Sequence, residues 1–392
     1  MVNVSKLTMG VAFFLLWSFL PVQAIKILHG PYLQNVNEHE ATIVWESDVN
    51  SIGWIELCPN DGTNFYATER PRYYDTGIGI KRDSRLHAVR LTGLQPGTTY
   101  RYRVYSQEVK DRGAYSSLFG YFAATDVFSK DPLRFTTLDT SKPETSFVVI
   151  NDLHERDSLF LPYAKYSNLD QRDMVIFNGD MMNSFRADSV YFKGFMDTAV
   201  KLFASEKPLY YVRGNHETRG AMAEYFHDYT CPRQSQLYFT WQQGPVFFIA
   251  LDTGEDKPDD DIEYYGFNQY DAYRSEEAKW LQEVVNSEAY KKAKYHVVIA
   301  HIPPAMDKSA WHGEIEVRQK FIPILNDVRV DLMICAHTHR FSYHPHAEGI
   351  NFPLVINSNN SVLYGETNNG QLTVKISDLK GKVIFNETYS SK

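Results

Sequence analysis

The sequence predicts a two-domain chain in which an all-β sandwich precedes an α/β layered domain. Short alternating runs of apolar and polar residues, separated by turns, fill residues 25–141 and indicate the sandwich. Strands separated by helical patterns follow in residues 142–392 and indicate the α/β layers. A polar stretch with a proline, residues 139–145, lies between the two patterns and places the boundary near residue 142.

The composition is that of a globular protein with a β-rich core. Of the 392 residues, 43% are hydrophobic and 14% are aromatic, which fits β-rich packing. The formal net charge of −8 argues against binding to nucleic-acid duplexes, which needs a basic surface. Cys58, Cys231 and Cys335 have no CxxC spacing, so we expect three free thiols and neither a disulfide framework nor a thiolate zinc site.

The first 24 residues have the features of a secretory signal peptide. Lys6 precedes an apolar run over residues 10–20, and Val22-Gln23-Ala24 is a small-residue cleavage site. The run ends at Pro21 and is shorter than the roughly 20 apolar residues of a membrane-spanning helix. We therefore expect cleavage after residue 24 and a secreted or periplasmic protein without a transmembrane span. An uncleaved membrane anchor is the alternative.

The expected elements follow in order. The turn at residues 94–100, Leu-x-Pro-Gly-Thr-x-Tyr, looks like the corner of a fibronectin type III domain, a fold that also occurs in adhesion modules without catalysis. The acidic stretch 255–261 is expected to be a solvated loop. Strands are expected at 41–45, 53–57, 86–91, 100–104, 135–137, 246–251 and 352–356, a hairpin at 372–385, and helices at 188–204, from 275 onward and at about 314–326.

Five further apolar runs each end in residues that can bind a metal. Because the C-terminal ends of buried strands carry these side chains, we expect a metal site along one edge of a sheet. Asp, His and Asn are ligands for hard or borderline divalent ions, and Asp180 can bridge two of them. The seven candidate ligands suffice for two ions, and such a pair attracts phosphate: Asp152, His154, Asp180, Asn215, His301, His337 and His339.

This ordered set of motifs resembles the calcineurin-like metallophosphoesterase superfamily over residues 145–365. The segment before it, with Gly30-Pro31-Tyr32-Leu33-Gln34, is similar to the N-terminal domain of purple acid phosphatases. The resemblance implies a two-layered β-sandwich flanked by helices. It also implies hydrolysis of a small phosphate monoester by a hydroxide that bridges two divalent or mixed-valence ions, drawn from Mn, Fe or Zn.

The resemblance also implies roles for individual residues. Asp152, His154, Asp180 and His339 would hold one ion, and Asp180, Asn215, His301 and His337 would hold the other. His216 would be the catalytic histidine beside the phosphate, and Glu217 would support the ligands. Arg219 and Arg340 are candidates for contact with the substrate phosphate.

Two residues depart from the pattern of purple acid phosphatases. His154 stands where that family has Gly, and Asn183 stands where it has a Tyr ligand. We therefore expect no charge-transfer colour and no requirement for ferric iron. Two other functions stay open: a phosphodiesterase or nucleotidase with the same ligands, and a non-catalytic adhesion protein in which the sandwich binds a partner.

Overall fold

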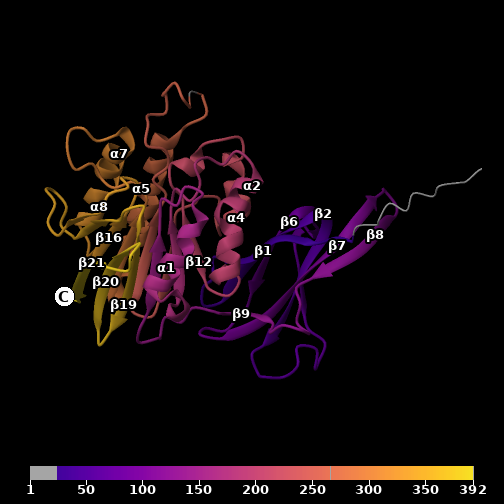
Figure 1. Cartoon of the computed structure of the whole chain (residues 1–392). Helices are drawn as coiled ribbons and strands as arrows, with labels where there is room; N and C mark the ends of the chain where they lie inside the picture. Colours follow the sequence, from indigo (N-terminus) through magenta and orange to yellow (C-terminus); the bar gives the residue numbers. More distant parts are fainter. Residues whose placement is uncertain (1–23, 265, 392) are drawn as a thin grey trace, which may run out of the picture.

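The computed structural model describes residues 24–264 and 266–391, with an all-β part beside a larger α/β part (Figure 1). Apart from Ala24, the predicted signal peptide lies outside the described residues. Among those residues, no helix is long and apolar enough to cross a membrane. The predicted boundary near residue 142 falls between β9 (Leu133–Thr136) and β10 (Ser146–Ile150).

The N-terminal part is all β, as predicted, but its two layers are joined by one long strand. β2 (Glu40–Pro59) pairs through its first half with β1 and β6 and through its second half with β7 and β3. The two strands predicted at 41–45 and 53–57 are therefore the halves of β2. The other strands are β1 (Ile27–Gln34), β3 (Arg72–Tyr74), β4 (Thr76–Gly77), β5 (Ile80–Lys81), β6 (Asp83–Thr92), β7 (Thr99–Arg112) and β8 (Ser117–Ala124).

The α/β part contains two six-stranded sheets that stack on a shared apolar core. One sheet has the order β12-β11-β10-β19-β20-β21, and the other has the order β13-β14-β15-β16-β18-β17. Their strands are β11 (Met174–Asn178), β12 (Leu209–Val212), β13 (Phe239–Gln243), β14 (Val246–Leu251), β15 (Tyr295–Ala300), β16 (Leu332–Cys335), β17 (Ser342–His344), β18 (Leu354–Ile356), β19 (Ser361–Asn368), β20 (Gln371–Asp378) and β21 (Val383–Ser390).

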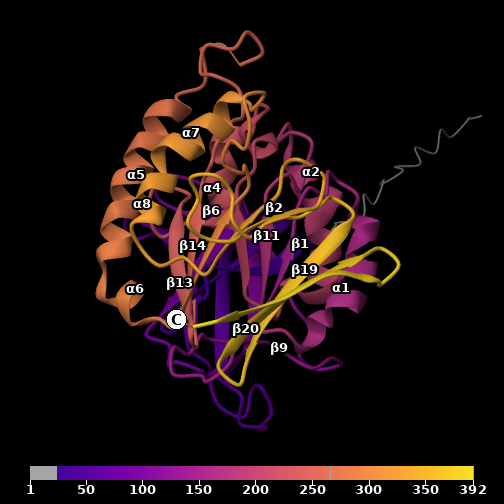
Figure 2. The same cartoon turned by 90° about the vertical axis from the view of Figure 1, so that its left-hand side faces the viewer.

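Helices cover the outer face of each sheet (Figure 2). The helix predicted at 188–204 is present, although two of its segments, η3 (Phe192–Met196) and η4 (Val200–Ala204), have π-helical hydrogen bonding. The helix predicted at 314–326 is divided at Phe321. The first sheet is covered by α1 (Phe160–Ser167), α2 (Asp188–Tyr191), α3 (Asp197–Ala199) and α4 (Phe226–Thr230), and the second by α5 (Tyr270–Asn286), α6 (Glu288–Lys292), α7 (His312–Lys320) and α8 (Ile322–Asn326).

The N-terminal part packs directly on the helices of the first sheet. Tyr32 and Val44 belong to the same apolar core as those helices. The buried Tyr32 hydroxyl donates a 2.8 Å hydrogen bond to the Tyr229 carbonyl, and the Tyr102 hydroxyl donates a 2.6 Å bond to the Ser205 carbonyl. Buried polar bonds of this kind fix the two parts in one arrangement.

Candidate metal centre

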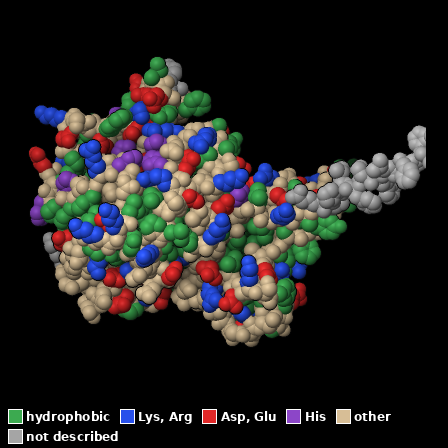
Figure 3. Space-filling view, viewed as in Figure 1, with side chains coloured by type: hydrophobic (Ala, Val, Ile, Leu, Met, Phe, Trp, Pro, Cys, Tyr) green, Lys and Arg blue, Asp and Glu red, His purple; other side chains and the backbone are tan. Residues whose placement is uncertain are grey.

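The candidate ligands gather where strands from both sheets end. β10, β11 and β12 run parallel in one sheet, and β15 and β16 run parallel in the other. Their C-terminal ends converge at the top of the α/β part, where Figure 3 shows His side chains grouped together. The prediction of a site along one sheet edge was therefore wrong in this respect, because two sheets contribute.

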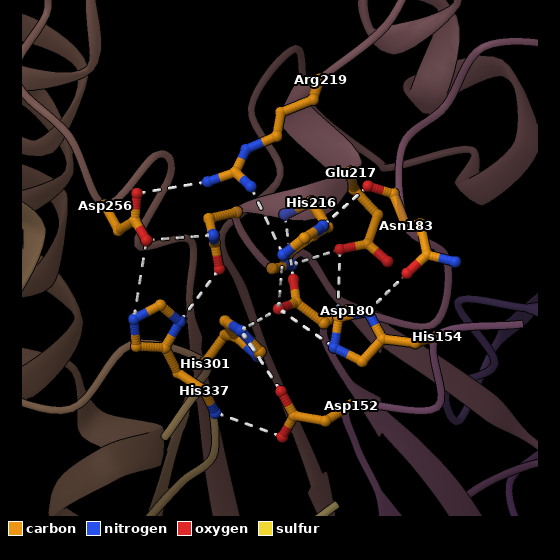
Figure 4. A network of polar contacts seen from close by, with 12 residues as sticks. Asp152, His154, Asp180, Asn183, His216, Glu217, Arg219, Asp256, His301 and His337 are labelled. Atoms are coloured by element: carbon orange, nitrogen blue, oxygen red, sulfur yellow. Dashed lines mark hydrogen bonds and ion pairs between the residues drawn. The ribbon is translucent and has the colours of Figure 1, made fainter. Parts of the chain in front are cut away.

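Six of the seven candidate ligands fall into two groups that share Asp180. Within each group, one ligand atom per residue lies within 4.8 Å of the others. Asn215 joins the second group, because its Oδ1 lies 3.0 Å from His337 Nδ1. The first group contains Asp152, His154, Asp180 and His339, and the second contains Asp180, His301 and His337. All of these except His339 are labelled in Figure 4.

Hydrogen bonds orient the two carboxylates so that one oxygen of each faces the other ligands. Asp152 Oδ2 accepts bonds from Asn151 Nδ2 at 2.7 Å and from the His337 backbone N–H at 3.2 Å. Asp180 Oδ1 accepts a 2.9 Å bond from the His216 backbone N–H. Asp180 Oδ2 then lies 3.1 Å from His301 Nε2, and Asp152 Oδ1 lies 3.3 Å from His339 Nε2.

The backbone is strained at most of these ligands. Asp152, His154, Asp180, His337 and His339 all have φ between 48° and 70°, a left-handed conformation that L-residues rarely adopt. Each such residue costs on the order of 1–3 kcal/mol and persists only where surrounding contacts impose it. The sharp turns bring ligand side chains from separate strand ends to a common point.

Two glycines leave room for the ligands. A Cβ atom on Gly214 would lie 2.3 Å from Asp180 Oδ1, and one on Gly179 would lie 2.3 Å from His301 Nδ1. Any side chain at either position would therefore displace a ligand. This close approach explains why glycine precedes Asp180 and Asn215 in the two motifs.

Glu217 ties the turns together beneath the ligands. Its fully buried carboxylate accepts backbone N–H bonds from Asp180 at 2.9 Å, Met181 at 2.8 Å and Gly214 at 2.9 Å. It also accepts a 2.8 Å bond from the Tyr211 hydroxyl. Glu217 therefore positions Asp180 through the backbone and is not accessible to solvent.

The donor atoms fit bound cations. Asp152 Oδ1 and His301 Nε2 are buried and have no hydrogen-bond partner among the described residues. The Nδ1 of His301 donates a 2.8 Å bond to the Asn178 carbonyl, which directs Nε2 at Asp180. His154 Nε2 and His339 Nε2 lie 3.0 Å apart. Carboxylate, amide and imidazole donors of this kind suit Mn, Fe or Zn.

Burial keeps two of the imidazoles in the form that binds metal. It lowers the pKa of His154, and it lowers the pKa of His337 to about 4, with the neighbouring His301 adding to the effect. Although burial alone would raise the pKa of Asp180, the adjacent His301 holds it well below its ordinary range. At neutral pH His154 and His337 are thus neutral and Asp180 is ionised. Although burial alone would lower it, the adjacent Asp180 raises the pKa of His301 to about 10, so an ion bound there would displace the His301 proton.

His216 lies at the mouth of the centre. Its Nδ1 donates a 2.7 Å bond to the Asn183 carbonyl, and its Nε2 lies 3.8 Å from Asp180 Oδ2. The side chain is 26% exposed, so a substrate can reach Nε2. The side chain of Asn183, which stands at the position of the missing Tyr, lies 3.2 Å from His154 Nδ1 and orients that imidazole.

Arg219 is held by carboxylates of this chain. Its guanidinium donates two bonds to Glu255, at 2.8 and 2.7 Å, and lies 3.2 Å from Asp256. A further 3.3 Å bond runs from Arg219 Nη1 to His216 Nε2. Arg340 is exposed next to His339.

The acidic stretch predicted as a solvated loop includes two buried site residues. Glu255 and Asp256 are 0% and 6% exposed, so the prediction was wrong for them. Asp256 Oδ2 lies 3.3 Å from Asn215 Nδ2 and 3.8 Å from His337 Nε2. The signal that could have found them is the same as at the other ligands: an apolar strand, β14, ends just before them.

A third group of possible ligands, Asp271, His312 and Glu316, is an ion-pair network. His312 Nε2 lies 2.8 Å from Asp271 Oδ1, which also accepts a 2.8 Å bond from Arg274. Lys320 pairs with Glu316 at 2.5 Å. Arg274 and Lys320 thus already neutralise the two carboxylates that a metal ion would bind.

The fold and the ligand set define a class of protein. Two stacked sheets with helices on both outer faces, and Asp, Asn and His side chains at the strand ends, form a metallophosphoesterase fold with an N-terminal all-β domain. A family model described as calcineurin-like phosphoesterase matches residues 145–341, half of the chain. The chain belongs to this family. A second model, the N-terminal domain of purple acid phosphatase, matches residues 30–121.

The individual proteins and structures that resemble this chain share a quarter or less of their aligned residues with it in the following comparisons. Two uncharacterized proteins of Mycobacterium tuberculosis, MT2654 of strain CDC 1551 and Rv2577 of strain H37Rv, are each 25% identical over 282 residues. These matches cover 66% of this chain and 50% of each relative, so the chain spans about half their length. The structure of purple acid phosphatase PPD1 from yellow lupin seeds matches with a TM-score of 0.62 and 12% identity, covering 91% of this chain and 73% of that one, which shows a shared fold.

Proposed function

We propose that this chain is an exported enzyme that hydrolyses phosphate monoesters with two divalent metal ions. The observation that carries the proposal is the pair of candidate ligand groups that share Asp180, each with a buried ligand atom that makes no hydrogen bond within the described residues. The proposed ligands are Asp152, His154, Asp180 and His339 for one ion, and Asp180, Asn215, His301 and His337 for the other.

The chemistry is divided between the ions and the side chains. When bound, a pair of divalent ions polarises phosphoryl oxygens and lowers the pKa of bound water toward about 7. Asp180 would hold both ions, and Glu217 keeps Asp180 in place by accepting its backbone N–H. His216 places its Nε2 beside the shared carboxylate. Once protonated, and turned from Arg219 to the substrate, Nε2 would stabilise charge on the phosphoryl group or give its proton to the leaving oxygen. Arg219 orients His216, and Arg340 is proposed to contact the phosphate from the open side.

The proposal of monoester substrates and the proposal of export are supported by different observations. The match to the N-terminal domain of purple acid phosphatase and the fold shared with the lupin enzyme favour a phosphatase. Export rests on the signal-like pattern of residues 1–24. We propose that the mature chain has an all-β domain at 25–141 and a catalytic domain at 142–392.

The proposal is tested by substituting Asp180, the residue that both candidate ligand groups share. Asp180→Asn keeps the shape of the side chain but removes its charge, and it should reduce hydrolysis of an aryl phosphomonoester by about 100-fold or more. The matched control is Asp131→Asn, because Asp131 is 93% exposed and should leave turnover unchanged. Circular dichroism checks that both variants are folded. Unchanged activity in Asp180→Asn would overturn the proposal.

The same assay separates the two ester classes. An aryl phosphomonoester and an aryl phosphodiester are compared with Mn, Fe and Zn in turn. A higher kcat/KM for the monoester supports a phosphatase. A higher kcat/KM for the diester would show that the chain is a phosphodiesterase that uses the same ligands.

A further inference from the structure

A cavity of about 660 Å³ lies beside the metal centre. One wall is the segment that follows η5 (His216–Thr218), and the other is the loop that leads into α5. This loop projects from the top of the molecule (Figures 1 and 2). The volume is in the range of small-molecule sites and exceeds what a phosphate group alone needs. The cavity can therefore hold an organic group attached to the phosphate.

Arg219 joins the cavity to the metal centre. It lines the cavity, and its guanidinium touches His216 Nε2 at 3.3 Å. The ring of Tyr264 lies over the same guanidinium, 5.1 Å from Arg219 Cζ to the ring centroid. The cavity thus begins one side chain away from His216, the residue proposed to meet the leaving oxygen.

The lining is rich in aromatic side chains. Phe226, Tyr264, Phe267, Tyr270 and Tyr273 all contribute to it. Phe267 is 93% exposed, so its ring is free to contact a bound ligand. Flat rings are attracted to such faces by stacking.

A buried polar group in the same lining has no partner. The Nδ2 of Asn268 makes no hydrogen bond within the described part of the chain. Buried amide donors are normally paired, because an unpaired one costs free energy. An acceptor atom on the edge of a bound ring would supply the missing partner.

The charges of the cavity argue against a second phosphate. Arg213 is paired with Asp252 at 3.1 and 2.7 Å, and Arg219 is paired with Glu255. Glu224 adds negative charge to the lining, and Glu263 is paired with Lys257 at 3.6 Å. Both guanidinium groups are thus neutralised by this chain, and an uncharged ring suits the cavity better than a polyphosphate.

We propose that this cavity binds the leaving group of the substrate, and that this group carries a flat, uncharged, hydrogen-bond-accepting heteroaromatic ring, as in a nucleoside 5′-monophosphate. The inference rests on the proposed phosphoesterase function and names the substrate class of that site. The P–O ester bond is cleaved by water, and the alcohol that carries the ring leaves with the proton.

The first experiment compares adenosine 5′-monophosphate with ribose 5-phosphate. Both release the same primary alcohol oxygen, so the ratio of their kcat/KM values reports the ring alone. We expect a preference of about tenfold or more for the nucleotide, and a ratio reduced about fivefold or more in Phe267→Ala and in Ala221→Trp, which fills the cavity. The matched control is Ile262→Ala, because Ile262 is 91% exposed on the same loop and does not line the cavity.

The second experiment measures adenosine binding to the full-length metal-loaded protein by calorimetry. Adenosine carries no phosphate, so its binding does not depend on hydrolysis. If adenosine binds and Phe267→Ala weakens it about fivefold or more, the cavity assignment holds even where neither ester is cleaved. If both esters are cleaved with equal kcat/KM, and adenosine does not bind, the inference is wrong while the proposed phosphoesterase stands.

Discussion

The candidate ligand side chains depend on backbone conformations that their own residue types disfavour. Asp152, Asp180 and His337 are left-handed at strand ends, where only Gly is unstrained. An Asp or His kept at such a position is held there by its surroundings, and strain of this kind gathers at functional sites. The residue pattern could be read from the sequence, but this strain could not, because it is imposed by contacts between strands far apart in the chain.

Gly214→Ala should disrupt the centre without touching a ligand directly. The added Cβ would lie 2.3 Å from Asp180 Oδ1, so the carboxylate must move. We expect bound metal to fall and turnover to drop by about 100-fold, since a displacement of about 1 Å costs that much in a positioned site. Metal analysis and steady-state kinetics measure both effects.

The matched control for this substitution is Gly77→Ala. A Cβ on Gly77 would find its nearest neighbour at 3.5 Å, which is ordinary contact. This variant should keep its metal and its turnover. A Gly214→Ala enzyme as active as this control would contradict the assigned role of the glycine.

Glu277→Gln should stabilise the protein at alkaline pH more than at acidic pH. Burial, and then the nearby Asp252 carboxylate, raise the pKa of Glu277, so the folded state favours its protonated form. The wild type therefore loses stability as pH rises through that raised pKa, whereas the neutral amide does not titrate. Gln can still accept the 2.8 Å bond from the Asp252 backbone N–H.

Urea unfolding at pH 5 and pH 8 measures this difference. The gain in unfolding free energy should be larger at pH 8. Glu276→Gln is the control on the same helix, because Glu276 is 66% exposed and should shift stability little at either pH. A gain that is equal at both pH values would contradict the assignment.

At the scale of elements, the strand pattern was predictable and the pairing between strands was not. The apolar runs at β10, β11, β12, β15 and β16 were identified because parallel strands are apolar throughout. Their division between two sheets depends on long-range pairing, which no local pattern encodes. In the same way, β2 looks like two strands, because the polar residues near Ser47 and Ser51 resemble a turn, whereas their hydroxyls bond to each other at 2.9 Å inside one strand.

Tyr32→Phe tests the contact between β1 and α4. The Tyr32 hydroxyl is buried and donates to the Tyr229 carbonyl, so its removal leaves a buried acceptor unpaired. We expect the free energy of unfolding to fall by about 1–3 kcal/mol in urea denaturation. Tyr115→Phe is the control, because Tyr115 is fully exposed, and an equal effect of the two substitutions would contradict a stabilising contact.

At the scale of the whole molecule, a sandwich packs beside a two-sheet α/β part whose candidate site lies where the two sheets meet. The seven ligand candidates were identified from sequence because each follows an apolar strand. Glu255 and Asp256 were missed, since acidic residues in a row ordinarily form a solvated loop. Their burial follows from Arg219, whose guanidinium pairs with both carboxylates.

The central claim is that turnover requires two ions held through Asp180. The direct measurement is a titration of chelator-treated protein with Mn, Fe or Zn, in which bound metal per chain and hydrolysis of a phosphomonoester are followed together. We expect turnover to appear as binding approaches about two ions per chain, and we expect Asp180→Asn to bind fewer ions and stay inactive. Full turnover with one ion per chain, or with none, would contradict it.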